Sequence, residues 1–231
     1  MIQLENVTFT YNGSEEKGNL KNISLSIRQG EVILLCGESG CGKTTLTRLI
    51  NGLIPWYYEG ELNGIVKVDG KEIREQPLHI LSRKIGSVFQ NPRSQFFNVD
   101  TTSEIAFSCE NQGLPEDEIR ERIHQTVSLF QIENLIDRNI FHLSGGEKQK
   151  IACASVSAGE PEIFVLDEPS SNLDVAAIED LKHIISCWKS AGKTVIIAEH
   201  RLYYLMELAD RIIYMQNGEI RRESGIRKLC D

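Results

Sequence analysis

Hydrophobic and polar residues nearly alternate along residues 2–9 and 20–27, which is typical of β-strands that bury one face. Three shorter runs are almost wholly apolar, at Val32 to Cys36, Ile163 to Leu166 and Thr194 to Ala198. Unbroken runs of this kind are typical of parallel strands that are buried on both faces. The pattern therefore predicts a parallel α/β core with a small antiparallel β layer beside it.

Turn residues and helical periodicities complete the outline of the chain. Asp69-Gly70 predicts a hairpin between residues 65–68 and 71–73, and a short helix from Pro77 leads to a strand at Ile85 to Phe89. Pro92 prevents that strand from continuing, so Gln90 is expected at its carboxyl end, where α/β proteins place ligand contacts. The polar loop Asn12 to Asn19, an aromatic loop from Ile54 to Gly60 and a charged tail from Arg221 are expected to be irregular.

Residues 91–147 have a different character, with helical patterns that start at Thr102 and Pro115. The second pattern has acidic residues at its start and one apolar face, as an amphipathic helix requires. Further on, Ser144 and Asp174 are expected to cap the N-termini of two helices. We interpret residues 1–90 and 148–231 as the core with its β layer, and 91–147 as an inserted helical subdomain, all within a single domain of 231 residues.

Composition narrows the classes of partner. The chain has 33 acidic and 25 basic side chains, a net charge of −8, which argues against nucleic acid as a partner. The six cysteines show no CxxC spacing, so we expect reduced thiols in a cytosolic protein. The N-terminus lacks the pattern of a signal peptide, and the longest apolar runs are far too short to span a bilayer, so any membrane role is expected to come through a partner.

The segment from Gly37 to Thr45, GESGCGKTT, lies between a predicted strand and a predicted helix. This is the context of a P-loop, in which backbone N–H groups surround a phosphate chain while glycines allow close approach. Lys43 then reaches the β- and γ-phosphates, and Thr44 ligates Mg²⁺. Cys41 is most simply a tolerated small residue, the alternative being a redox role. The expected contacts to a nucleoside triphosphate are Gly37, Glu38, Ser39, Gly40, Cys41, Gly42, Lys43, Thr44 and Thr45.

Two acids follow the buried strand at residues 163–166. At such a strand end in a P-loop enzyme, Asp167 is expected to hold Mg²⁺, and Glu168 to orient the attacking water. His200 follows another strand and, from the residues alone, is equally well a satisfied loop residue.

Taken together, the P-loop, Gln90, LSGGEKQK at 143–150, IFVLDEPSSNLD at 163–174 and His200 resemble the ATP-binding subunit of ABC transporters in order and spacing. The resemblance covers the whole chain and implies an α/β P-loop ATPase with ATP and Mg²⁺ as cofactors. One departure is Glu147, where the commonest form of the signature has Gln.

The resemblance also implies roles for individual residues. It implies a head-to-tail homodimer or heterodimer, in which Ser144, Gly145 and Gly146 cover ATP on the P-loop of the other subunit. Glu168 would be the catalytic base, His200 a switch at the γ-phosphate, and Gln90 a further Mg²⁺ ligand linked to the transporter. Tyr11 would stack on the base, although a tyrosine that caps the core at a strand end remains the alternative. The loop crossing the dimer would contain Ser171, Asn172 and Asp174.

Residues 90–114 resemble more narrowly the ATPases of energy-coupling factor transporters, which import vitamins or transition-metal ions. That likeness implies a transmembrane coupling protein and a small substrate-binding membrane protein as partners, at the cytoplasmic face of the cell membrane. Phe96 and Phe97 would lie where coupling helices dock, or else be packed inside the subdomain. The ATPase of an exporter and a soluble mechanochemical ABC ATPase remain alternatives, and the transported solute is not readable from the sequence.

Overall fold

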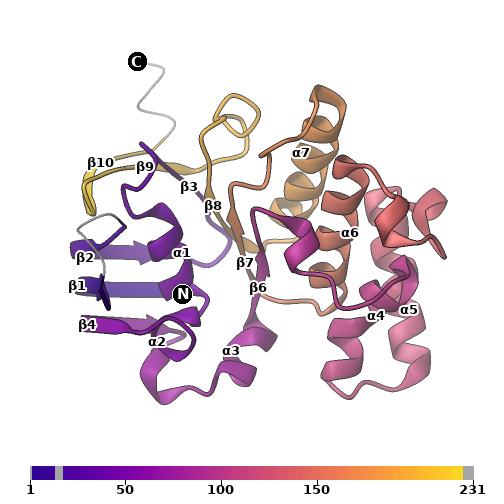
Figure 1. Ribbon diagram of the computed structural model, residues 1–231, viewed down its shortest axis with the longest axis horizontal. Helices are drawn as coiled ribbons and strands as arrows, with labels where there is room; N and C mark the ends of the chain where they lie inside the picture. The colour runs from indigo at the N-terminus through magenta and orange to yellow at the C-terminus, as the bar shows by residue number, and fades with distance from the viewer. Residues whose placement is uncertain (1, 14–17, 226–231) are drawn as a thin grey trace.

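The computed structural model describes residues 2–13 and 18–225 (Figure 1). In this part of the chain the strands form two sheets. The larger sheet has the order β10-β9-β3-β8-β7-β6, in which β10 is antiparallel to β9 and the other neighbours are parallel. Its strands are β3 (Val32–Gly37), β6 (Ile85–Val88), β7 (Ile163–Asp167), β8 (Thr194–Ala198), β9 (Arg211–Gln216) and β10 (Glu219–Gly225).

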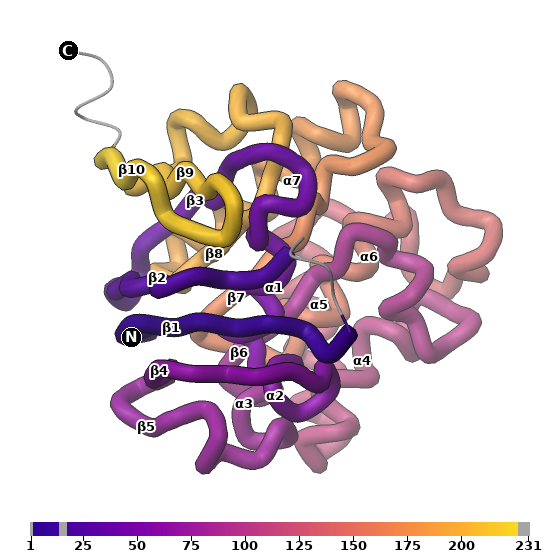
Figure 2. The backbone as a smooth tube through the Cα atoms, turned by 60° about the vertical axis from the view of Figure 1, so that its left-hand side comes forward, coloured from indigo at the N-terminus to yellow at the C-terminus, as the bar shows by residue number. Residues whose placement is uncertain are grey.

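The smaller sheet is antiparallel and has the order β2-β1-β4-β5. Figure 2 shows these strands one beside the next, with β10 beyond β2. They are β1 (Ile2–Tyr11), β2 (Leu20–Ile27), β4 (Gly60–Val68) and β5 (Lys71–Glu72). The predicted parallel core and antiparallel layer are therefore confirmed.

The helices fall into two groups on either side of the larger sheet. Near the antiparallel sheet lie α1 (Lys43–Ile50), α2 (Leu53–Trp56) and α3 (Leu78–Lys84). On the other side are α4 (Thr101–Asn111), α5 (Glu116–Phe130), α6 (Gly145–Ala158) and α7 (Val175–Ser190). Figure 1 shows α4 and α5 at the end of the molecule opposite β1, β2 and β4. The expected subdomain boundary at residues 147 and 148 falls inside α6, and the division into subdomains stays a prediction.

The alternating side chains of the central strands divide the core in two. Val32 and Leu34 of β3 belong to the apolar cluster beneath α4 to α7, whereas Ile33 and Leu35 belong to the cluster shared with α1 and the antiparallel sheet. All four side chains are fully buried. This two-residue periodicity is what a strand covered on both faces requires, and it places the carboxyl end of β3 between the two clusters.

Two expectations of irregular structure were wrong in part. Arg221 does not begin a tail, because β10 continues to Gly225 and pairs with β9. The segment from Ile54 to Gly60 contains the short helix α2 and enters β4, so it is only partly a loop. Residues 14–17 of the expected loop, and residues 226–231 with Cys230, lie outside the described residues. Cys36, Cys41, Cys109, Cys153 and Cys187 are free thiols.

Among residues 2–13 and 18–225, no helix has both the length and the apolar character needed to cross a bilayer.

Candidate active site

The P-loop turns from β3 into α1 around the side chain of Lys43. Lys43 Nζ donates to the backbone oxygens of Gly37 (2.9 Å) and Glu38 (3.1 Å), and lies 3.9 Å from the Sγ atom of Cys41. The side chain is almost wholly buried. The loop therefore holds an ammonium group at its centre, beside the N-terminus of α1, which is a favourable position for phosphate oxygens.

Glycine is required at the start of this loop. Gly37 has a φ of 148°, and a Cβ atom there would lie 2.2 Å from the backbone oxygen of Met215 and 2.8 Å from Cys41 Sγ. Gly42 has a φ of 105° and precedes the first residue of α1. The β9–β10 turn supports the loop from outside, because the Gly218 N–H donates to the Cys41 oxygen at 3.0 Å.

The loop also places Thr44 opposite the acid at the end of β7. Thr44 Oγ1 donates to Asp167 Oδ1 at 3.1 Å. Burial raises the pKa of the Asp167 carboxyl, and the bond from Thr44 opposes that effect. A partly buried carboxylate beside a hydroxyl is a donor set that suits Mg²⁺, whose charge would compensate the cost of burial.

Glu168 lies between two polar side chains that come from different parts of the sequence. Gln90 Nε2 donates to Glu168 Oε2 at 2.9 Å, and His200 Nε2 lies 3.0 Å from Glu168 Oε1. These residues follow β6, β7 and β8, three adjacent parallel strands whose carboxyl ends meet at one edge of the sheet. Gln90 therefore contacts Glu168 in this structure, and its expected role as an Mg²⁺ ligand stays a prediction.

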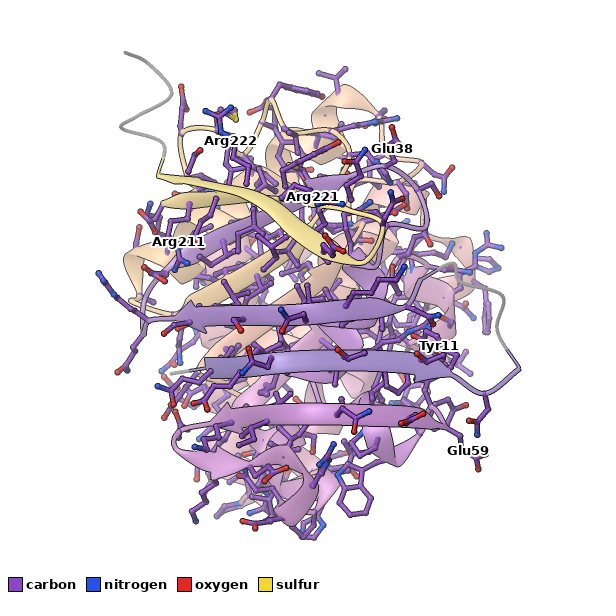
Figure 3. The ribbon with its side chains drawn as sticks, turned by 90° about the vertical axis from the view of Figure 1, so that its left-hand side faces the viewer. Tyr11, Glu38, Glu59, Arg211, Arg221 and Arg222 are labelled. Carbon is purple, nitrogen blue, oxygen red and sulfur yellow. The ribbon has the colours of Figure 1, made fainter. Side chains whose placement is uncertain are left out.

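Tyr11 ends β1 on the same side of the molecule as Glu38 of the P-loop, as Figure 3 shows. Its hydroxyl lies 3.2 Å from Thr45 Oγ1 and accepts a hydrogen bond from Arg48 Nη1 at 3.1 Å. Its ring meets those of Phe9 and Tyr58 edge to face. The Tyr11 hydroxyl is thus hydrogen-bonded to α1, directly after the P-loop. Stacking of its ring on a base stays a prediction.

The signature residues lie at a second location. Ser144, Gly145 and Gly146 line a pocket of about 310 Å³ together with Asn172 and Asp174. Ser144 is the N-cap of α6, and Glu147 completes a reciprocal capping box with it: Glu147 N–H donates to Ser144 Oγ, and Ser144 N–H donates to Glu147 Oε2. These bonds are the main cause of a lowered pKa of Glu147. Glu147, the residue that differs from the commonest form of the signature, therefore stabilises the N-terminus of α6.

Further hydrogen bonds, which sequence reasoning missed, hold these residues from behind. Ser171 Oγ donates to the Gln90 oxygen at 3.2 Å. Glu199, only 2% exposed, accepts hydrogen bonds from the backbone N–H groups of His200 and of Ser170, which is two residues after Glu168. Glu199 follows a buried strand, which could have marked it as a site residue, but its partners lie too far along the chain to be deduced.

A family model described as ABC transporter matches residues 20–171. The chain belongs to the ABC transporter family. A protein of Treponema denticola, described as an ABC transporter ATP-binding protein, is 55% identical over all of this chain, which covers 47% of that relative. A relative of the same description from Pyrococcus horikoshii is 42% identical over 95% of the chain and 78% of its own length.

Solved ABC structures share the fold. The cbiO1 protein of Clostridium perfringens, part of the ABC transporter complex cbiONQ, has a TM-score of 0.87 at 29% identity, covering 99% of this chain and 90% of that one. The cassette MJ0796, solved as a dimer bound to ADP and Pi, has a TM-score of 0.84 at 28% identity, covering 98% and 99%. The chain is thus a member of the ABC transporter family with the fold of the solved ABC cassettes. It spans about half the length of the first curated relatives that it matches.

Proposed function

We propose that this ABC ATPase energises a transporter of the energy-coupling factor type, which takes up a vitamin or a transition-metal ion. The observation that carries the ATPase part is the position of Glu168, whose two oxygens lie within 3.0 Å of Gln90 Nε2 and His200 Nε2, directly after Asp167. A carboxylate at this point can accept a proton from an attacking water while both neighbours hold it in place.

The remaining site residues bind and orient the nucleotide. Lys43 exchanges its two backbone oxygen partners for oxygens of the β- and γ-phosphates, and the N-terminus of α1 contributes backbone N–H groups. Thr44 and Asp167 would hold Mg²⁺, which when bound neutralises charge that develops on the phosphates. His200 would contact the γ-phosphate, and Tyr11 would stack on the base.

A dimer completes the proposed site. Ser144, Gly145 and Gly146 line their own pocket, at the N-terminus of a helix of 14 residues, and present a second set of backbone N–H groups for an anion. Pairing head to tail, either with a second copy or with a related ATPase, would bring this pocket over the P-loop of the other subunit. Ser171, Asn172 and Asp174 would lie on the loop that crosses the dimer.

The membrane partner would dock beside Phe97. This side chain is 75% exposed and stacks on Phe107 with a centroid distance of 4.7 Å, at the edge of a pocket of about 290 Å³. Phe96 differs, because it is partly buried and packs against the core cluster beneath α4 to α7. The similarity to cbiO1, part of the complex cbiONQ, supports the energy-coupling factor type.

The experiment is affinity capture of the complete protein from native membranes in mild detergent, followed by mass spectrometry. Recovery of a transmembrane coupling protein with a small substrate-binding membrane protein would support the proposal, and would place the chain at the cytoplasmic face of the membrane. Recovery of a paired or fused permease alone would support another transporter class, such as an exporter. Recovery of soluble partners alone would reject transport in favour of a soluble mechanochemical ATPase. Phe97→Ser, with exposed Phe141→Ser as a matched control, would test the docking position.

A further inference from the structure

The carboxylate of Glu199 joins the two loops that carry the central pair of the active site. Glu199 directly precedes His200 and is 2% exposed. Its Oε1 accepts the backbone N–H groups of His200 (2.7 Å) and Arg201 (3.1 Å), so it closes the turn that follows β8. Burial of a carboxylate is costly unless such donors surround it.

The other oxygen of Glu199 reaches the second loop. Oε2 accepts the backbone N–H of Ser170 at 3.2 Å, two residues after Glu168, and the hydroxyl of Tyr204 at 3.0 Å. Tyr204 is itself buried, and its burial together with the Glu199 charge raises the pKa of its hydroxyl. Four donors therefore converge on one carboxylate, two for each oxygen.

Two further contacts join the same loops. The Glu168 N–H donates to the Ala198 oxygen at 2.8 Å, and Arg201 Nη1 donates to the Leu173 oxygen at 3.2 Å. Glu168 itself has a φ of 45°, an uncommon conformation that surrounding contacts must maintain. The distance between Glu168 and His200 thus depends on how these loops are held, and the Glu199 carboxylate accepts backbone N–H groups from both loops.

We propose that Glu199 is a positioning residue for ATP hydrolysis, which fixes the His200 turn and the loop after Glu168 at the separation that their side chains need. This inference rests on the proposed roles of Glu168 and His200. Glu199 acts through these neighbours and not on the nucleotide, so its loss lowers kcat and leaves the KM for ATP nearly unchanged.

The test compares Glu199→Gln, Tyr204→Phe and Glu207→Gln in the complete protein. Glu199→Gln turns one acceptor into a donor that faces two donors, and we expect kcat to fall about 10- to 100-fold with KM within about twofold. Tyr204→Phe removes one of the four bonds and keeps the carboxylate, so we expect a smaller fall of a few-fold. Glu207 is the matched control, because it is an exposed glutamate on the same segment whose side chain is 81% exposed in an ion pair with Lys182. Glu207→Gln is expected to keep the wild-type rate.

A double-mutant comparison distinguishes positioning from general destabilisation. If Glu199 acts through His200, Glu199→Gln adds little further loss in a His200→Ala background. A loss of the same factor in both backgrounds, or a wild-type kcat in folded Glu199→Gln, would overturn the inference. If Glu199→Gln does not fold, a wild-type kcat in Tyr204→Phe would also overturn the inference. Failure of the proposed function is separate, since it would appear as missing turnover in the wild type or undiminished turnover in Glu168→Gln.

Discussion

Replacing Glu168 by Gln changes the chemistry of the site with little change in its shape. The new amide oxygen can accept the hydrogen bond from Gln90 Nε2, which now measures 2.9 Å. The new amide nitrogen can donate to His200 Nε2 in the tautomer that leaves this atom free to accept, across the present 3.0 Å. Both contacts survive, but an amide cannot take a proton from water. We therefore expect loss of turnover without loss of nucleotide binding.

The expected loss of catalytic rate in Glu168→Gln is much larger than its expected loss of stability. Loss of a general base costs about 10²–10⁴ in rate, or about 2.7–5.5 kcal/mol of barrier. Hydrogen bonds to a charged group are worth about 1 kcal/mol more than neutral ones, so the two contacts together would lower the free energy of unfolding by no more than about 2 kcal/mol. A partly exposed site reduces that figure further, since the Glu168 side chain is 23% exposed.

The assay is single-turnover hydrolysis of ATP with Mg²⁺, alongside equilibrium binding of ATP and denaturant unfolding. Glu207→Gln serves again as the control for the loss of one carboxylate. If the chain forms the proposed dimer, we expect Glu168→Gln with ATP to remain closed, visible as a persistent dimer in gel filtration. A hydrolysis rate within about threefold of wild type would refute the role of Glu168 as base, because the loss expected for a general base is far larger.

Three further predictions concern the loop, the base contact and the helix start. Gly37→Ala would place a Cβ atom 2.2 Å from the Met215 backbone oxygen. We therefore expect the affinity for ATP, measured by titration, to fall at least tenfold, and an unchanged affinity would contradict this. Tyr11→Phe should bind ATP nearly as well as the wild type. Tyr11→Ala should raise the Kd for ATP about tenfold, since base stacking is worth about 1–3 kcal/mol. Equal affinities of Tyr11→Ala and the wild type would argue that Tyr11 only caps the core. The hydrogen bonds with Ser144 lower the pKa of Glu147 in the folded state. The ionised carboxylate of Glu147 therefore stabilises the protein at neutral pH, and this contribution is lost as the pH falls through the folded-state pKa. Unfolding of Glu147→Gln should therefore be easier than wild type at neutral pH and should converge with it in acid, and a constant difference would exclude the linkage.

The sequence predicted the core of the fold because the relevant signals are local. Unbroken apolar runs indicated β3, β7 and β8, and the glycine spacing of the P-loop indicated a turn whose backbone Gly37 indeed requires. The capping residues Ser144 and Asp174 also lie where they were expected, since both side chains accept a backbone N–H from the first turn of their helices.

The sequence could not predict contacts that depend on the ends of separate strands. Glu199 and Ser170 are 29 residues apart, and only the pairing of β7 with β8 brings them together. Residues 221–225 did not read as a strand because charged and polar side chains on an edge strand give little hydrophobic signal. Phe96 and Phe97 are neighbours in sequence with different surroundings, which no periodicity of a short loop reveals.

The division of the core by the central sheet has a consequence for local opening. Strand β3 has a hydrogen-bonded neighbour on each side and an apolar cluster on each face, so its amides can meet solvent only when both clusters come apart. We expect them to show the slowest hydrogen exchange in the molecule, at the free energy of global unfolding. Helices α4 and α5 lie outside that sheet, so we expect their amides to open at a lower free energy than those of β3. Local opening at that end would then leave intact the strand that leads into the P-loop.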